Sequence, residues 1–522
     1  MTALDRTTPV AVVGTGTMGQ GIAHVALLAG HPVFLYDALP GRAAEAAEVI
    51  SRRLERMVEK GRITPERRDD ARGRLIPTGA IGELAGCGLV VEAILEHVEA
   101  KQALFRELEE SVADDCLLAT NTSSLSVTQI AGALRLPGRF VGLHFFNPAL
   151  LLPLVEVVSG FATDAQAAER AYETALAWGK SPVRCSDTPG FIVNRLARPF
   201  YAEAFRLYEE RVADPATIDA VLRESGGFKM GPFELTDLIG QDVNEAVTRS
   251  VWESFHHDPK FPPSLAQRRL VQSGRLGRKS GQGWFSYGTG AADGKNAADR
   301  KPAQPPVPRT EPLCEAPEAV TIRPDLGPAA ELTELIREAG IKVNLDDVLE
   351  VSPGQGTITL PYGTQLGLVD GSLSTGQVPD DHILFDLALD YRSCTRIALA
   401  PGQEVVERDL RYAIGLFQKL GKKVSVIGDA SGMIVARTVA RLVDLAMDAV
   451  AQGVASAEDI DTAMKLGVNY PLGPLEWAEG LGSPWVRDLL EAMHRCHRSD
   501  GCYAPSPALH RHAALYEKRS SR

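Results

Sequence analysis

Short apolar runs alternate with helical segments through the first 190 residues. Val10 to Val13 and Pro32 to Tyr36 are typical of buried strands, and the small-residue segment Gly21 to Ala29 between them favours a helix. Further strand candidates follow, most of them separated by helical segments: Leu89 to Ile94, Leu117 to Thr120, Phe140 to Phe145 and Leu154 to Val158. Strands that alternate with helices are typical of a mostly parallel, doubly wound α/β sheet. The N-terminal part is therefore predicted to be a Rossmann-like domain.

The pattern changes after Pro189-Gly190. It is helical up to about Tyr287, and the stretch after it is rich in Gly, Ala, Pro and charge, which indicates a flexible linker. Short strand-like runs then return, and a helical tail begins near Gly432; the runs are Val320 to Arg323, Ile383 to Phe385 and Arg396 to Leu399. We predict a Rossmann-like domain (1–188), an all-α domain (189–287), a linker (288–315), a degenerate α/β domain (316–428) and a second helical domain (429–522).

The helical tail repeats an earlier part of the chain. Residues 179–240 and 421–482 align without gaps at an offset of 242. The identities that carry the alignment are Gly179-Lys180 with Gly421-Lys422, Asp187 with Asp429, Gly190 with Gly432, Arg195 with Arg437, Ile218-Asp219 with Ile460-Asp461, Gly231-Pro232 with Gly473-Pro474 and Gly240 with Gly482. A duplicated helical domain is the simplest account of so many matches in one register.

Composition and charge narrow the functional class. A chain of 522 residues with 44% apolar residues forms several globular domains. A net charge of −12 argues against non-specific binding to nucleic acid or to an anionic membrane. The seven cysteines show no Cys-x-x-Cys spacing and the N-terminus has no apolar signal region, so we expect reduced thiols, no metal site and a cytoplasmic location.

A glycine-rich motif follows the first predicted strand and opens a helix. It reads Gly14-Thr15-Gly16-Thr17-Met18-Gly19. Gly14 permits the tight turn, Gly16 lets the backbone approach a pyrophosphate, and Gly19 lets the helix pack closely. Asp37 ends the second strand, where its carboxylate binds a ribose 2′-hydroxyl and repels a 2′-phosphate. The motif predicts an NAD site; the alternative is a glycine-rich turn beside a surface Asp.

A candidate acid–base pair lies on two further predicted strands. His144 is near the end of the run Phe140 to Phe145, and Glu156 lies inside the apolar run Leu154 to Val158. A histidine takes a hydroxyl proton readily near neutral pH, and a buried carboxylate needs a partner. A His144–Glu156 pair satisfies both demands. The alternative is a core histidine bonded to the backbone and a strand glutamate that faces water.

Two polar positions complete the candidate chemistry. Ser123 lies in the run Asn121-Thr122-Ser123-Ser124 after a strand, where a hydroxyl can bind a substrate oxygen. A turn or helix cap is the alternative for such a run. Asn194 lies where the sheet gives way to helices, and it is either a donor to a substrate oxygen or a cap.

Six stretches together strongly resemble the 3-hydroxyacyl-CoA dehydrogenase family. They span residues 8–290 in order: Gly14-Thr-Gly-Thr-Met-Gly-Gln-Gly-Ile-Ala23, Val91-Glu-Ala-Ile-Leu-Glu96, Asn121-Thr-Ser-Ser124, His144-Phe-Phe-Asn-Pro148, Thr188-Pro-Gly-Phe-Ile-Val-Asn194 and Gly231-Pro-Phe-Glu234. The long form, with its second helical domain, resembles the bacterial 3-hydroxyadipyl-CoA dehydrogenases of phenylacetate breakdown. The resemblance implies NAD-dependent oxidation of an (S)-3-hydroxyacyl-CoA, 3-hydroxyadipyl-CoA or 3-hydroxybutyryl-CoA, in phenylacetate or fatty-acid catabolism.

The resemblance also implies a role for each matching position. His144 would be the general base with Glu156 orienting it, and Ser123 and Asn194 would hold the reacting oxygen. Other positions would bind the cofactor or CoA: Asp37 at the adenosine ribose, Glu96, Lys101, Ser123 and Lys279 along the NAD site, and Arg53 and Lys60 at CoA. Arg53 and Lys60 lie on a basic helical stretch from Gly41 to Arg74, for which a solvated charged face is the alternative interpretation.

The second half lacks the chemistry of the first. Asn194 maps onto Ala436, no Gly-x-Gly-x-x-Gly follows Val320 to Arg323, and His382 has no Phe-Phe-Asn-Pro beside it. We therefore expect one active site per chain. Single-unit relatives dimerise through the helical domain, so the fused copy is expected to form an intrachain pseudo-dimer; further homo-oligomers stay open.

Two rival functions stay open at this point. One is a dehydrogenase of free 3-hydroxy acids on the same scaffold; such enzymes use a lysine base, and the His144–Glu156 pair argues against it. The other is a non-catalytic NAD-binding structural relative, and the intact pair together with Asn194 argues against it.

Overall fold

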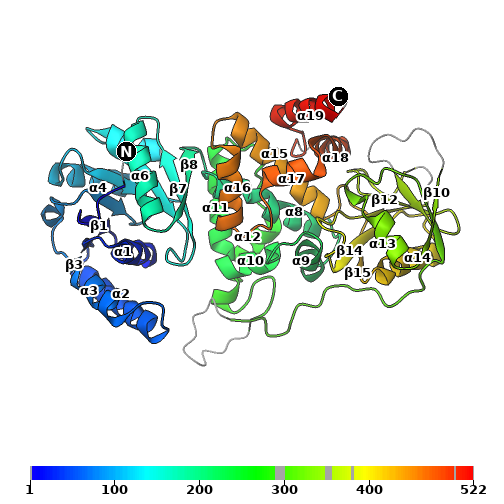
Figure 1. Cartoon of the computed structure of the whole chain (residues 1–522), viewed down its shortest axis with the longest axis horizontal. Coiled ribbons are helices and arrows are strands. Elements are labelled where there is room, and N and C mark those ends of the chain that lie inside the picture. Colours follow the sequence, from blue (N-terminus) through cyan, green and yellow to red (C-terminus); the bar gives the residue numbers. More distant parts are fainter. Residues whose placement is uncertain (1–2, 288–299, 347–355, 378–380, 499–500, 521–522) are drawn as a thin grey trace. The chain divides into compact units, whose positions relative to one another are not determined.

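The computed structural model describes residues 3–287, 300–346, 356–377, 381–498 and 501–520 (Figure 1). It consists of two compact units. The first comprises residues 1–195 together with 452–468, and the second comprises residues 196–451 together with 469–522. No helix in the described ranges is long and apolar enough to cross a membrane.

The first unit is built on an eight-stranded sheet in the order β3-β2-β1-β4-β5-β6-β7-β8. All neighbours are parallel except β6 and β7, which are antiparallel. The strands are β1 Val10–Val13, β2 Val33–Tyr36, β3 Leu75–Pro77, β4 Leu89–Glu92, β5 Leu117–Thr120, β6 Phe140–Phe145, β7 Leu154–Ser159 and β8 Ser181–Ser186. Four of them (β1, β4, β5 and β6) are buried at every position, because helices cover both faces of a doubly wound sheet. The predicted Rossmann-like fold is confirmed; β3 and β8 were not among the predicted strands.

The helices of this sheet are α1 Thr17–Ala29, α2 Arg42–Glu59, α3 Pro65–Gly73, α4 Val98–Ser111, α5 Val127–Ala131 and α6 Ala165–Ala177. The stretch from Gly41 to Arg74, predicted as one long helical segment, is two helices that pack against β3 (Figure 1). The break has a local cause. Gly61 has a positive φ of 64°, and Thr64 caps the second helix through the Arg67 amide ahead of Pro65.

The first helical region runs from α7 to α12. Its helices are α7 Val193–Leu196, α8 Arg198–Glu209, α9 Pro215–Glu224, α10 Pro232–Ile239, α11 Gln241–Ser254 and α12 Leu265–Gln272. Residues 288–299 of the predicted linker lie outside the described ranges. Residues 300–315 belong to the second unit. There the Arg309 amide donates to the Thr217 hydroxyl, and the Glu311 amide donates to the Val424 carbonyl.

The second unit contains a seven-stranded sheet in the order β10-β9-β11-β12-β13-β14-β15. Its strands are β9 Ala319–Ile322, β10 Lys342–Leu345, β11 Thr357–Thr359, β12 Gln365–Leu368, β13 His382–Phe385, β14 Arg396–Pro401 and β15 Lys423–Val426. Helix α13 (Leu332–Glu338) packs on β10, and α14 (Glu407–Lys419) packs on β14 and β15 (Figure 1). The sequence pattern predicted β9, β13 and β14; the other four strands are too short and mixed to stand out.

The tail forms α15 Val435–Ala451, α16 Ala457–Gly467, α17 Pro474–Leu481, α18 Ser483–Cys496 and α19 Pro507–Ser520. The repeat is also visible in the backbone. Phe191 and Met433, 242 positions apart, both have a φ of 50°. Helix α16 belongs to the first unit, where it packs on β7 and β8, whereas its counterpart α9 packs on β14 in the second unit.

Candidate active site

The strand register brings His144 and Glu156 together. In the antiparallel pair β6–β7 they are direct partners, which places their side chains on the same face within reach of each other. His144 Nδ1 lies 2.6 Å from Glu156 Oε2, and the exposed fractions of the two residues are 5% and 0%. Because a carboxylate accepts, Nδ1 is the donor in this contact, and in a neutral imidazole Nε2 then has the lone pair. The rings of Phe146 and Phe191 flank the imidazole.

Glu156 has a second duty. Its Oε1 accepts hydrogen bonds from the Ile192 and Val193 amides at 3.0 and 2.9 Å. These amides belong to the start of α7, whose N-H groups have no partner within the helix. A fully buried carboxylate is thus satisfied at both oxygens. The same side chain orients His144 and fixes the segment that carries Asn194.

Asn194 reaches the loop that carries Ser123. Its Nδ2 donates to the Ser123 carbonyl at 3.3 Å. On the same loop, Asn121 Oδ1 accepts from the Phe145 amide, next to His144. The structure therefore joins the ends of β5 and β6 and the start of α7. The turn alternative holds for Thr122, whose hydroxyl accepts from the Leu125 amide, whereas the cap of the following helix α5 is Ser126.

Glu96 accepts hydrogen bonds from three residues of this loop. Its Oε1 accepts from the Thr122 hydroxyl at 2.7 Å and from the Ser123 and Ser124 amides at 2.9 and 3.0 Å. Burial would raise the pKa of Glu96, but these bonds and Lys101 outweigh it and lower the pKa. Glu96 is therefore ionised at neutral pH.

Lys101 is buried between two carboxylates. Its Nζ lies 2.5 Å from Glu92 Oε1 and 3.4 Å from Glu96 Oε2. Glu92, at the end of β4, also accepts from the Thr120 hydroxyl. Glu92 is not among the residues predicted from the sequence; the signal that marks it is a charged residue inside the apolar run Leu89 to Ile94.

The glycine motif forms an open turn at the start of α1. Gly14 has a positive φ of 92°, and a side chain on it would collide with Ala93. Gly16, the first residue before α1, has nothing within 4 Å of where a Cβ would lie, and no side chain caps the helix. The amides of Thr17, Met18 and Gly19 therefore start an uncapped helix of 13 residues. A Cβ on Gly19 would meet the Gly14 carbonyl, so it is the turn itself that requires this glycine.

Asp37 lies beside that turn. Its carboxylate accepts from the Thr15 amide and hydroxyl at 2.9 and 2.7 Å. Burial would raise the pKa of Asp37, but hydrogen bonds from Thr15 and Leu39 outweigh it and lower the pKa. An ionised carboxylate there suits a ribose hydroxyl and opposes a 2′-phosphate.

The basic residues that the family resemblance assigns to CoA and NAD are Arg53, Lys60 and Lys279, which lie on different parts of the chain. Arg53 is half-buried on α2, and burial together with the charge of Arg56 lowers its pKa. Burial, with a contribution from the charge of Arg53, lowers the pKa of the buried His24 to about 4. Lys60 is exposed at the end of α2. Lys279 belongs to the second unit and pairs with Asp242.

The second sheet repeats the antiparallel strand pairing but has no histidine and glutamate at the equivalent positions. At the offset of 242, His144 corresponds to Asp386 and Glu156 to Ala398, and the Asp386 amide donates to the Ala398 carbonyl. Asp386 Oδ2 accepts from the Ile434 and Val435 amides, the counterparts of those bound by Glu156. The repeat thus extends into the sheet, farther than residues 179–240. His382 corresponds to Phe140 and is not a remnant of His144.

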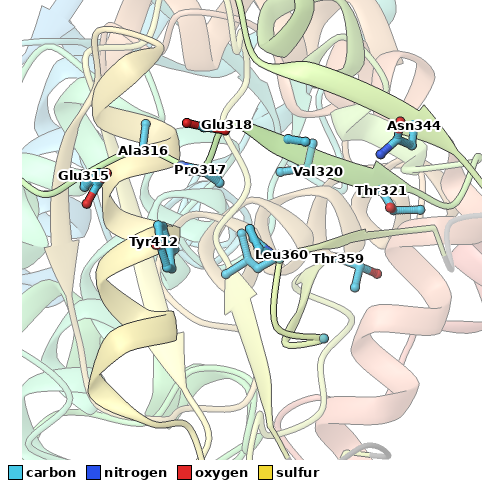
Figure 2. Close-up of a pocket in the computed structure, with 13 residues that line it drawn as sticks. Glu315, Ala316, Pro317, Glu318, Val320, Thr321, Asn344, Thr359, Leu360 and Tyr412 are labelled. Atoms are coloured by element: carbon cyan, nitrogen blue, oxygen red, sulfur yellow. The ribbon is translucent and has the colours of Figure 1, made fainter.

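A hollow of about 600 Å³ lies over the second sheet beside α14 (Figure 2). Its charged lining residues are Glu315 and Glu318, and Tyr412 closes one side. The described residues that line it include no lysine or arginine, so it offers no cation to a phosphate.

Comparisons with known proteins find related descriptions in both halves of the chain. The family description "3-hydroxyacyl-CoA dehydrogenase, NAD binding domain" matches residues 9–188, and the description of the C-terminal domain of that family matches twice, at 190–287 and 432–520. A "3-hydroxybutyryl-CoA dehydrogenase reduced Rossmann-fold domain" matches residues 371–430.

Whole-chain relatives share both halves. A 3-hydroxyadipyl-CoA dehydrogenase of Escherichia coli is 42% identical over 97% of each chain. A crystal structure of a 3-hydroxybutyryl-CoA dehydrogenase from the same species has a TM-score of 0.86 at 39% identity and covers 99% of this chain and all of that one. A probable 3-hydroxybutyryl-CoA dehydrogenase of Deinococcus radiodurans is 39% identical and covers 53% of this chain and 99% of its own.

The chain belongs to the 3-hydroxyacyl-CoA dehydrogenase family. Its activity is the NAD-dependent oxidation of a 3-hydroxyacyl-CoA thioester, an oxidoreductase reaction at a CH–OH group.

Proposed function

We propose that His144 is the general base of this oxidation and that Glu156 orients it. The observation that carries the proposal is the buried 2.6 Å contact between His144 Nδ1 and Glu156 Oε2. Nε2 takes the proton of the 3-hydroxyl as the C3–H bond breaks, and Glu156 stabilises the imidazolium that forms. In the reverse direction protonated His144 returns the proton to the oxygen. Replacing His144 with Gln and measuring kcat tests the assignment.

Ser123 and Asn194 hold the reacting oxygen in this proposal. The support is the hydrogen bond between Asn194 and the Ser123 carbonyl, which places both at the edge of the sheet where β5 and β6 end. Fixed donors near the oxygen reduce the entropy lost on reaching the transition state. The same arrangement, with its acid–base pair, argues against a non-catalytic role.

The residues at the first βα turn fit NAD. The open backbone at Gly16 and the uncapped start of α1 suit a pyrophosphate, and Asp37 suits the adenosine ribose. Glu96, Lys101 and Lys279 are the further residues that we assign to the cofactor. Bound NAD supplies the acceptor for the hydride that leaves the substrate carbon.

Arg53 and Lys60 are assigned to the CoA phosphates. Arg53 lies on α2 and Lys60 directly follows it, in the stretch 41–74, where ten lysines and arginines outnumber seven acidic residues in an otherwise acidic protein. Charge-removing variants of these two residues are expected to raise KM for the thioester and to leave KM for NAD unchanged.

We propose 3-hydroxyadipyl-CoA or 3-hydroxybutyryl-CoA as the substrate, in phenylacetate or fatty-acid catabolism in the cytoplasm. The support is the pair of whole-chain relatives, one named for each substrate. Comparing kcat/KM on the two thioesters decides between them, because only the adipyl chain ends in a carboxylate. Turnover of a free 3-hydroxy acid, without turnover of its thioester, would overturn the thioester assignment.

The fused second helical domain takes the place of a partner subunit in our proposal. Reciprocal contacts support this. The Ser186 amide donates to the Val454 carbonyl, and the Gly428 amide donates to the Val212 carbonyl. At the offset of 242, Gly428 is the counterpart of Ser186 and Val454 is the counterpart of Val212, so the same contact is made in both directions. Contacts in which i meets j and j meets i are the mark of a two-fold interface.

Charged side chains on α8 and α15 pair between the two repeats. Buried Glu203 on α8 binds Arg437 and Arg441 on α15, at 3.2 and 3.4 Å. The counterparts of Glu203 and Arg441 are Leu445 and Pro199, so two copies of α15 would lack the carboxylate. The counterpart of Arg437 is Arg195, so a second copy of the first repeat would still present one arginine to Glu203. Buried ion pairs of this kind select one partner over another.

A fragment of residues 1–290 tests the pseudo-dimer. The fragment is expected to lose activity or to self-associate, because it lacks α15 and α16. If it is monomeric, stable and fully active, the proposal is wrong.

A further inference from the structure

Part of the second helical repeat is built into the catalytic unit. Residues 452–468 cluster with the first sheet, and α16 packs on β7, the strand that carries Glu156, and on β8. Just before α16, the Gly453 carbonyl accepts from the Ser186 hydroxyl at 2.8 Å, and the Val454 carbonyl accepts from the Ser186 amide. The far end of α16 is equally close, since a Cβ on Gly467 would lie 2.7 Å from Leu154 and 3.0 Å from Val193.

One contact from this segment reaches the neighbour of Asn194. Gln452 Oε1 accepts a hydrogen bond from Arg195 at 2.7 Å, and Arg195 is only 2% exposed. Asn194 and Arg195 are consecutive on α7, a helix of four residues. Its start is held by Glu156 through the Ile192 and Val193 amides. The short segment that carries Asn194 is thus fixed at one end by the catalytic pair and at the other by Gln452.

The second unit contains the matching contact without the chemistry. Arg437 is the counterpart of Arg195, and it pairs with Glu210, the counterpart of Gln452, at 3.0 and 3.3 Å. The residue beside Arg437 is Ala436, which has no group to offer a substrate. The contact between this arginine and its acceptor therefore supports the fold in both units. In the first unit it also sets the position of Asn194.

We propose that Gln452, from the second repeat, is a positioning residue of the dehydrogenase site, which it acts on through Arg195 and Asn194. The inference rests on the proposed role of Asn194. It gives the second half a part in catalysis beyond that of a scaffold. Small displacements of a group that holds the reacting oxygen have large effects on turnover, because alignment supplies much of the rate.

The test uses full-length Gln452→Ala with NAD and an acyl-CoA substrate. We expect kcat to fall about tenfold, with KM for NAD unchanged within about twofold. Gln452→Glu keeps an acceptor for Arg195, as Glu210 does for Arg437, and is expected to restore kcat to within about threefold of the wild type. The matched control is Glu210→Ala, which removes the acceptor for Arg437 in the second unit. This variant should lower Tm while kcat stays unchanged.

A double-mutant cycle with Asn194→Ala distinguishes positioning from general damage. If Gln452 acts through Asn194, Gln452→Ala has little further effect on kcat in the Asn194→Ala background. Additive losses, an unchanged kcat in Gln452→Ala, or equal losses in Glu210→Ala would each overturn the inference. An unchanged kcat in Asn194→Ala alone would instead reject the proposed role of Asn194, and the inference with it.

Discussion

Two strand pairs of this protein share one geometry but not one chemistry. In the first unit, β6 and β7 place His144 opposite Glu156; in the second, β13 and β14 run antiparallel in the same register, with Asp386 and Ala398 at the equivalent positions. Both pairs fasten the start of the helix that follows. Glu156 does so from β7, whereas Asp386 does so from the position equivalent to His144.

The difference shows which part of the arrangement the fold requires. A buried helix start needs an acceptor for its free amides, and both halves keep a carboxylate for it. The imidazole is not needed for that purpose, and the second half has none at this position. Glu156 binds this helix start and also the His144 imidazole, whereas Asp386 binds the helix start with Ala398 opposite it.

The largest expected effect comes from His144→Gln. Loss of the base should reduce kcat by about 10³-fold, while NAD binding stays nearly intact because the glycine turn and Asp37 are untouched. Steady-state kinetics and titration with NAD measure the two. The control is His382→Gln, which alters the buried histidine of the second sheet and should leave kcat unchanged; equal losses in both variants would contradict the comparison.

Glu156→Gln separates the two duties of the carboxylate. The amide oxygen still accepts from Ile192 and Val193, but the amide NH2 is a donor and cannot accept from the His144 N-H. We expect kcat to fall about 10²-fold with a small change in Tm. A kcat close to that of the wild type would show that orientation by Glu156 is dispensable.

Asp37→Asn should weaken the cofactor site by a smaller amount. Loss of the charged acceptor for a ribose hydroxyl is expected to raise KM for NAD about tenfold and to reduce the discrimination against NADP. The pKa of Asp37 in the wild type is lowered from 3.8, so this group adds no pH dependence to KM for NAD between pH 6 and 9. Preference for NADP in the wild type would contradict the assignment.

The smallest effect on activity is expected from Asp386→Ala. Removing the carboxylate leaves the Ile434 and Val435 amides without this acceptor, which should cost about 1–3 kcal/mol of stability and leave kcat unchanged. A loss of kcat comparable to that of Glu156→Gln would break the comparison.

The same variant has a pH signature. Burial raises the pKa of Asp386 from 3.8 to about 6, so the folded chain binds this proton more tightly than the unfolded chain. Its contribution to stability therefore falls as the pH rises from about 4 to about 6 and is constant above that. The Tm difference between wild type and Asp386→Ala should be larger at pH 5 than at pH 7.

Local sequence patterns determined a large part of this protein. The buried strands, the glycine turn with Asp37, and the repeat at an offset of 242 depend on near neighbours or on identity, which a single sequence displays. Family motifs added His144, Glu156, Ser123 and Asn194 as one set. Short or mixed strands such as β3, β8 and β12 were missed because their apolar pattern is weak.

Only the tertiary structure decided which distant groups meet. Lys101 lies between Glu92 and Glu96 because β4 turns into α4, and Asp386 takes over a cap through a strand register that no local signal encodes. The contact of Gln452 with Arg195 spans 257 positions, and sequence distance says nothing about it. Local propensities act over a few residues, whereas such contacts depend on how whole elements pack and on where buried polar groups find partners.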